Sequence, residues 1–127
     1  MKLLEVINEF TVENIEESVN FYSRYFGFEV IEEDGNPLTW VKMRKDNAII
    51  MLESYNQVVK EIKNYPNKVR TSNLIKFKYD NKVEVTNLYN KFLENKVYIF
   101  MDLKNTEYGA LEFGVVDLDG NMIIVSC

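Results

Sequence analysis

Apolar and polar residues alternate along the stretch 4–12 of this 127-residue chain. Phe10 and Val12 fall on one side of the stretch, whereas Glu5 and Glu9 fall on the other. A period of two residues is typical of a β-strand with one buried face and one exposed face. We therefore expect a strand here, with Phe10 and Val12 in the core.

The period then changes to that of an amphipathic helix. Asn14 is a favourable N-cap, apolar residues recur at helical spacing from Ile15 to Phe26, and Gly27 can take the left-handed conformation that ends a helix. Alternation returns afterwards in three further predicted strands, near residues 28–33, 38–44 and 48–54.

The same order of elements recurs in the second half of the chain. Residues 7–31 match the sequence 67 positions later, and residues 38–54 match the sequence 73 positions later, which makes Trp40 the counterpart of Phe113. We place the six extra residues of the later copy in a loop near 104–108 and interpret the match as an internal duplication. The elements predicted in the second copy are a strand at 73–80, a helix at 82–94 that ends at Asn95, and strands at 97–103, 109–117 and 121–126.

The predicted fold class is α+β, with two repeated βαβββ units in a single domain that spans residues 1–127. The units cover about 1–54 and 73–127, and a polar connector, 55–72, contains a possible short helix around Val58. Because one helix covers only one face of each sheet, the other face remains available. Two such sheets can curve together into an open barrel-like cup with the helices outside, and side chains inside the cup would contact a ligand.

The composition narrows the classes of partner. A net charge of −5 argues against binding to nucleic acid or to an anionic membrane. The one cysteine, Cys127, cannot form an intramolecular disulfide and fits a reducing environment. The chain has no histidine, so it lacks the commonest general base and the commonest transition-metal ligand. We expect a cytoplasmic protein that has neither nucleic acid nor membrane as a partner.

Two segments resemble a known family. NIEESVNFYSRYFGFEV, residues 14–30, resembles the first helix and second strand of the glyoxalase/bleomycin-resistance/dioxygenase superfamily, the vicinal oxygen chelate proteins. GALEFGVVDLDGNMII, residues 109–124, resembles the closing hairpin of that superfamily, although Leu118 replaces the proline usual in its turn. The resemblance covers nearly the whole chain outside the connector and is far more specific for the fold than for the substrate.

Metal-dependent members of this superfamily place one ligand on the first and fourth strand of each unit. The matching positions in this sequence are Ile7, Met51, Leu74 and Ile124. These apolar side chains are poor ligands for a divalent cation. The resemblance therefore implies a metal-independent small-molecule binding protein without a cofactor. It is similar to the bleomycin-resistance branch, whose members are acidic dimers that sequester an antibiotic.

The candidate ligand-binding residues come from the predicted cup: Glu9, Trp40, Met51, Lys76, Tyr98, Met101 and Phe113. Glu5, Glu9 and Glu53 would make one side acidic, whereas Lys76 and Lys78 would make the other side basic. Each of these charged residues could equally belong to a solvated strand face, and Trp40 and Phe113 could equally be core residues. Which alternating set of the strand 97–103 faces the cup stays open.

Two alternatives come from other functional classes. One is a lyase or another enzyme of the same fold, which would use Glu9, Glu53 or a lysine for acid–base chemistry or hold an atypical metal site. A carboxylate with a strongly raised pKa in the cup would favour that alternative. The other is a purely regulatory or interaction module. No catalytic residue is predicted for the binding protein itself.

The ends of the chain predict a homodimer. Apolar residues run through LLEVIN at 3–8 and IIVSC at 123–127, where a monomer would leave them on its surface. A symmetric dimer would bury them and pair exposed strand edges.

Overall fold

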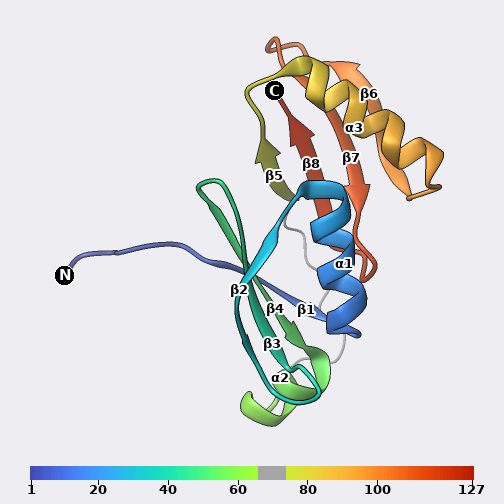
Figure 1. Ribbon diagram of the computed structural model, residues 1–127. Coiled ribbons are helices and arrows are strands. Elements are labelled where there is room, and N and C mark those ends of the chain that lie inside the picture. The colour runs from blue at the N-terminus through green and yellow to red at the C-terminus, as the bar shows by residue number, and fades with distance from the viewer. Residues whose placement is uncertain (66–73) are drawn as a thin grey trace. The chain divides into compact units, whose positions relative to one another are not determined.

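The computed structural model describes residues 1–65 and 74–127; residues 66–73, which include part of the expected connector and the start of the expected strand 73–80, lie outside the described residues. The chain divides into two compact units, Met1–Val69 and Arg70–Cys127. Each unit contains one four-stranded sheet and one long helix (Figure 1). This confirms the α+β class and the two βαβββ units, whereas the cup stays a prediction.

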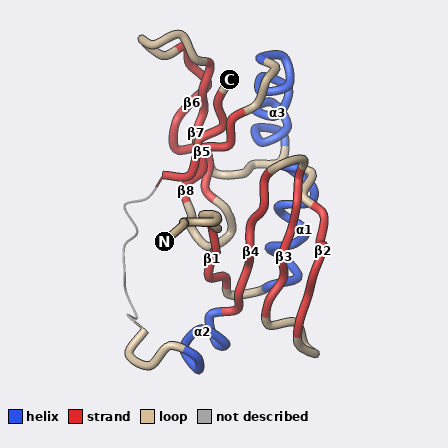
Figure 2. Tube along the Cα trace, turned by 90° about the vertical axis from the view of Figure 1, so that its left-hand side faces the viewer, coloured by secondary structure: helices blue, strands red, loops and turns tan. Residues whose placement is uncertain are grey.

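The first unit has the sheet order β1-β4-β3-β2, with β1 parallel to β4 and the other pairs antiparallel (Figure 2). Its elements are β1 (Asn8–Val12), α1 (Ile15–Phe26), β2 (Glu29–Asp34), β3 (Trp40–Lys45), β4 (Ala48–Ser54) and α2 (Tyr55–Glu61). The short helix expected around Val58 is α2, which begins at the N-cap Ser54.

Helix α1 forms as the sequence predicts and covers one face of this sheet. The side chain of Asn14 accepts a hydrogen bond from the backbone N–H of Glu17 at 3.0 Å, and Gly27 ends the helix with φ of 74°. Tyr22 of α1 is fully buried and stacks on Phe10 of β1, with 5.5 Å between the ring centroids. The core of the unit therefore lies between α1 and the sheet face that carries Phe10.

The second unit repeats this arrangement with the sheet order β5-β8-β7-β6. Its elements are β5 (Leu74–Lys78), α3 (Lys82–Glu94), β6 (Ile99–Asn105), β7 (Leu111–Val116) and β8 (Met122–Ser126). Phe113 of β7 is fully buried and packs edge-on against Tyr89 and Phe92 of α3, which places the core under that helix. In each unit we call the sheet face turned away from the long helix, α1 or α3, the far face.

The strand register corrects one equivalence expected from the sequence. Trp40 pairs with Glu53 on the far face of the first sheet, whereas Phe113 pairs with Val125 on the face under α3. Because partners across antiparallel strands share a face, Trp40 corresponds to Glu112 and not to Phe113. The sequence match aligned Trp40 with Phe113 because this aromatic residue directly follows Glu112, the true counterpart of Trp40.

The six extra residues of the second unit are not gathered near 104–108, as the sequence match suggested. The separation between equivalent residues grows in steps along the chain: 67 for Glu9 and Lys76, 69 for Val30 and Ile99, 72 for Val41 and Phe113, and 73 for Met51 and Ile124. Extra residues therefore enter in and at the end of α3, within β6 and its following loop, and in the turn before β8. Both units keep a register irregularity at the same place, after Val30 and after Ile99.

Three smaller expectations also need correction. Strand β1 begins only at Asn8, and residues 1–7 run away from the first sheet as an exposed arm (Figure 1). After α3 the left-handed residue is Lys96, with φ of 55°, whereas Asn95 caps the helix through its side chain. The C-terminal strand β8 is interior to its sheet, and Ile123 and Val125 are fully buried, so these side chains are not left on the surface of the unit.

The register predicts unequal costs for two aromatic truncations. Phe113→Ala should lower the free energy of unfolding by about 3–5 kcal/mol, because it empties a fully buried site under α3. Trp40→Ala should cost clearly less, because Trp40 is partly exposed on the far face. Urea unfolding of both variants and of the unchanged protein measures the difference. Equal losses would contradict the assignment of the two residues to different faces.

Candidate functional site

The far face of the first sheet carries two rows of side chains across neighbouring strands. Glu9, Met51 and Lys42 form one row, from β1, β4 and β3. The next row consists of Thr11, Glu53 and Trp40 on the same three strands. The face therefore combines two carboxylates, a lysine and two apolar side chains, and it contains three of the predicted ligand-binding residues.

Glu53 is the most perturbed group on this face. It is only 8% exposed, and it lies next to Glu9 of β1 and Glu61 of α2. Burial, followed by the interactions with Glu61 and Glu9, raises the pKa of Glu53 to about 7. In the same group the pKa of Glu61 is lowered, because Gln57 and Glu53 hydrogen-bond to it. Glu53 is therefore about half protonated at neutral pH, and its protonated form donates a hydrogen bond to the carboxylate of Glu61.

The far face of the second sheet has the corresponding two rows. Lys76, Ile124 and Gly114 form one row on β5, β8 and β7, and Lys78, Ser126 and Glu112 form the next. Glu112 and Ser126 are buried, with 4% and 3% of their surface exposed. The second face thus places a carboxylate where the first face has Trp40.

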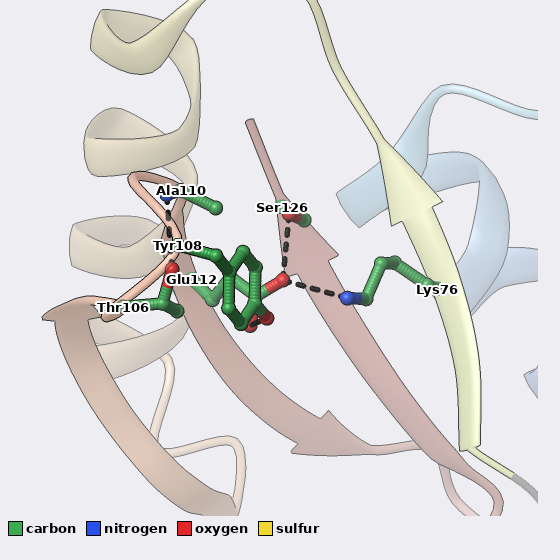
Figure 3. A network of polar contacts seen from close by, with 6 residues as sticks. All are labelled: Lys76, Thr106, Tyr108, Ala110, Glu112 and Ser126. Carbon is green, nitrogen blue, oxygen red and sulfur yellow. Dashed lines mark hydrogen bonds and ion pairs between the residues drawn. The ribbon is translucent and has the colours of Figure 1, made fainter.

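Glu112 is the centre of a polar network that joins three elements and a loop (Figure 3). Its Oε2 accepts hydrogen bonds from Ser126 Oγ at 2.8 Å and from Lys76 Nζ at 2.8 Å, and its Oε1 accepts from the Tyr108 hydroxyl at 2.7 Å. Burial opposes ionisation of Glu112, but these donors outweigh it and lower its pKa to about 2. The carboxylate in turn raises the pKa of Lys76. Lys76 and Glu112 are therefore a charged, mutually neutralising pair.

An aromatic ring also covers part of this face. The register irregularity between Ile99 and Met101 leaves Phe100 and Met101 both opposite Gly114. A Cβ atom on Gly114 would lie 2.5 Å from Cζ of Phe100, which is closer than real side chains approach. The absence of a side chain at Gly114 is thus what lets the Phe100 ring lie against β7.

The predicted site residues fall into three groups. Glu9, Trp40 and Met51 lie on the far face of the first sheet, and Lys76 and Met101 lie on the far face of the second. Tyr98 precedes β6, is 68% exposed, and accepts a hydrogen bond from the Val116 N–H through its backbone oxygen at 3.3 Å. Phe113 is a correction: it is fully buried in the core under α3, where a ligand does not reach it.

The four positions that match metal ligands of the superfamily also have defined places. Met51 and Ile124 lie on the far faces, Leu74 begins β5, and Ile7 lies just before β1 and is 40% exposed. Within residues 1–65 and 74–127, no group of three or more Asp, Glu, Cys or His side chains is arranged to hold a metal ion. The apolar side chains at these four positions do not fit the metal centre of the metal-dependent members.

Comparison with known proteins gives a family and a fold. The sequence profile of the Glyoxalase/Bleomycin resistance protein/Dioxygenase superfamily matches residues 5–125. The chain belongs to this superfamily. No curated protein sequence matches it.

Several solved structures of low sequence identity share its fold. A glyoxalase-related enzyme from Fulvimarina pelagi superposes with a TM-score of 0.82 at 14% identity, covering 98% of this chain and 88% of the other. Lactoylglutathione lyase from Agrobacterium tumefaciens gives 0.76 at 17% identity, covering 97% and 92%. TioX from Micromonospora sp. ML1 gives 0.72 at 14% identity, covering 97% of both chains. These similarities show the fold of this chain.

Sequence reasoning missed the groups that hold the second face together. Ser126 is distant from Tyr108 and Glu112 in the sequence, and only the pairing of β7 with β8 brings Glu112 opposite Ser126. A glutamate among the apolar residues of β7 was the one visible signal, because a charged residue in a buried strand needs a partner. Glu61 was missed because the contact depends on α2 folding back towards β4.

The raised pKa of Glu53 predicts a pH-dependent stability. A carboxyl whose pKa is higher in the folded state than its usual 4.5 binds more protons when folded, so its contribution to folding stability falls as the pH rises from about 4.5 to about 7. Glu53→Gln should remove this loss, which amounts to about 2–3 kcal/mol. Urea unfolding near pH 5 and near pH 8 compares the two proteins, since other groups cancel in the difference.

The exposed Glu33 of β2 provides the matched control, as Glu33→Gln makes the same chemical change away from Glu53. A Glu53→Gln variant with the same pH profile as the unchanged protein would refute the assignment.

The stability that Glu112 contributes depends on pH with the opposite sign, because the pKa of Glu112 is depressed in the folded state. This stability is present above the usual pKa of a glutamate and is lost as the pH falls towards about 2.

Proposed function

We propose that the protein binds a small organic molecule without a metal ion, through the far faces of its two sheets. The observation that carries the proposal is the identity of the residues at the four metal-ligand positions of the superfamily: Ile7, Met51, Leu74 and Ile124. None of these side chains offers a strong donor to a divalent cation, and all of them offer apolar contact to a ligand.

The proposed contacts mix apolar and polar groups, as small-molecule sites usually do. They are Glu9, Trp40, Met51, Lys76, Tyr98 and Met101, together with Glu53. Lys76 contributes little net charge because Glu112 neutralises it. The far face of the first sheet carries Glu9, Glu53 and Lys42, so it offers both hydrogen-bond donors and acceptors to the polar groups of a ligand.

A second candidate function rests on Glu53 alone. A buried carboxyl with a pKa of about 7 can donate or accept a proton at neutral pH, as a general acid or base requires. In that case the protein is an enzyme of the same fold that does its chemistry without a metal. Glu53→Gln would then abolish turnover of a bound compound while leaving its affinity within a few fold.

Metal-independent binding predicts ligand stabilisation that survives a chelator. The protein is incubated with EDTA, dialysed, and screened by thermal denaturation against small metabolites and antibiotics, including bleomycin and other glycopeptides. A ligand that binds only the folded state raises the unfolding temperature, and a concentration of about 100 times Kd contributes about 2.7 kcal/mol. We expect at least one class of compound to give the same shift with EDTA as with added zinc, nickel or manganese.

The control for this screen is Trp40→Ala, which removes a proposed contact from the far face of the first sheet. It should reduce the ligand-induced shift without abolishing folding. Stabilisation that appears only after a transition metal is added would contradict the proposal.

We also propose a homodimer in which the N-terminal arm contacts a second copy. Leu3, Leu4 and Val6 are 82%, 83% and 79% exposed, and the arm continues into β1, an edge strand that pairs only with β4. Unpaired strand edges and exposed apolar side chains are both stabilised by covering them. A stable interface of this kind buries on the order of 1,000 Å² or more.

Sedimentation equilibrium at micromolar concentration tests the dimer. The unchanged protein should have twice the mass of one chain, and the double variant Leu4→Asp, Val6→Asp should sediment as a monomer, because two charges on the arm oppose its burial. Lys2→Asp is the control for a charge placed on the same arm at a polar position. A single-chain mass for the unchanged protein would rule the dimer out.

A further inference from the structure

Tyr108 is an exposed aromatic side chain that is nevertheless held in one position. The residue is 70% exposed, but its hydroxyl donates to Oε1 of the buried Glu112 at 2.7 Å. The loop that carries it is closed by hydrogen bonds from the Thr106 N–H to the Ala110 oxygen at 2.7 Å and from the Ala110 N–H to Thr106 Oγ1 at 2.9 Å (Figure 3). The loop and the side chain are therefore ordered before any ligand arrives.

Stability alone does not require this arrangement. A buried ion pair is commonly no more stabilising than apolar residues of similar volume, because both charges lose their hydration. Apolar side chains in place of Glu112 and Ser126 would continue the apolar pattern of β7 and β8. The network instead fixes the positions of side chains, because one carboxylate binds Lys76, Ser126 and the hydroxyl of Tyr108 at the same time.

A second aromatic ring lies on the same face, one step along β7. Glu112 and Gly114 are two residues apart on this strand, which corresponds to about 7 Å. Tyr108 is bonded to the first of these positions, and the ring of Phe100 lies against the second. The ammonium of Lys76 is 5.6 Å from the centre of the Tyr108 ring, and its charge is balanced by Glu112. The surface around the two rings is thus aromatic and ordered, and Lys78 and Lys104 add positive charge to the same face.

We propose that Tyr108 and Phe100 form a recognition surface for a planar aromatic group, and that Glu112 acts as the positioning residue that holds Tyr108 for it. This inference rests on the proposed binding function and names the ligand class of the second sheet. Aromatic rings prefer to contact other rings face-on or edge-on, and an ordered tyrosine loses little conformational freedom when it binds one. A saturated ring of the same size lacks that preference.

A matched pair of probes separates aromatic recognition from general apolar contact. We would titrate the EDTA-treated protein with 2-naphthol and with decahydro-2-naphthol and follow backbone amide shifts, including that of Gly114. The account predicts tighter binding of 2-naphthol by about tenfold, with the largest shifts at residues 100, 108 and 114. Tyr108→Leu and Phe100→Leu should each remove most of this preference.

Further variants test the positioning role and the geometry. Glu112→Gln and Tyr108→Phe keep the rings but weaken the tether, so each should lower the preference for 2-naphthol by a few fold. Gly114→Ala should do the same, because the new methyl group displaces the Phe100 ring. The control is Tyr25→Leu, which removes a tyrosine that also lies beside a cation, Arg24, but stands on α1. The Tyr108 variants remove one hydrogen bond from the buried Glu112, so each should lower the unfolding temperature somewhat while the protein still folds.

Failure of this inference can be distinguished from failure of the proposed binding function. Equal affinity for the two probes, or an unchanged preference in Tyr108→Leu, would overturn the inference while leaving metal-independent binding intact. Absence of binding by both probes would overturn it as well, and the compound screen would then decide separately whether the protein binds small molecules of another class.

Discussion

Strands β1, β3 and β4 bury the side chains of one face beneath α1, and β7 and β8 bury theirs beneath α3. This constraint determines which residues remain to meet a ligand. Phe10, Val41 and Leu52 are committed to the core under α1, and Phe113 and Val125 to the core under α3. A shift of one residue in any strand would exchange these side chains with the polar and apolar residues of the far face. The cores under α1 and α3 therefore fix the composition of the candidate site before any functional residue is considered.

The two units have the same arrangement of strands and long helix, but the carboxyl groups on their far faces differ in protonation. On the first far face, burial and neighbouring carboxyl groups favour a protonated Glu53, whereas on the second far face three donors keep Glu112 ionised. Equivalent rows of the two far faces thus contain a proton donor in one unit and a fixed anion in the other. This difference arises from a few substitutions: Glu9 corresponds to Lys76, Trp40 to Glu112, and Glu53 to Ser126. Such divergence after duplication allows one domain to present chemically distinct surfaces.

Much of the fold could be predicted from the sequence because its signals are local. The caps at Asn14, Gly27 and Asn81, the helical periods and the alternation of the strands all depend on neighbours within a few residues. The errors arose where long-range pairing decides the outcome. A one-residue insertion in the turn before β8 moved Phe113 out of step with Trp40, and residues 4–7, next to the edge strand β1, are not part of a strand. The partners of Glu112 could not be predicted for the same reason, because Lys76, Tyr108 and Ser126 meet only after β5, β7 and β8 have paired.

The central claim is that apolar residues occupy the places where metal-dependent relatives of this superfamily hold their ion. Addition of Mn²⁺ to the isotope-labelled protein, followed by amide spectra, tests it residue by residue, because a bound paramagnetic ion broadens the signals of nearby nuclei. The account predicts that the amide signals of Ile7, Met51, Leu74 and Ile124 keep their intensity relative to the rest of the chain. Selective loss of those four signals at an equimolar concentration of Mn²⁺ would contradict it.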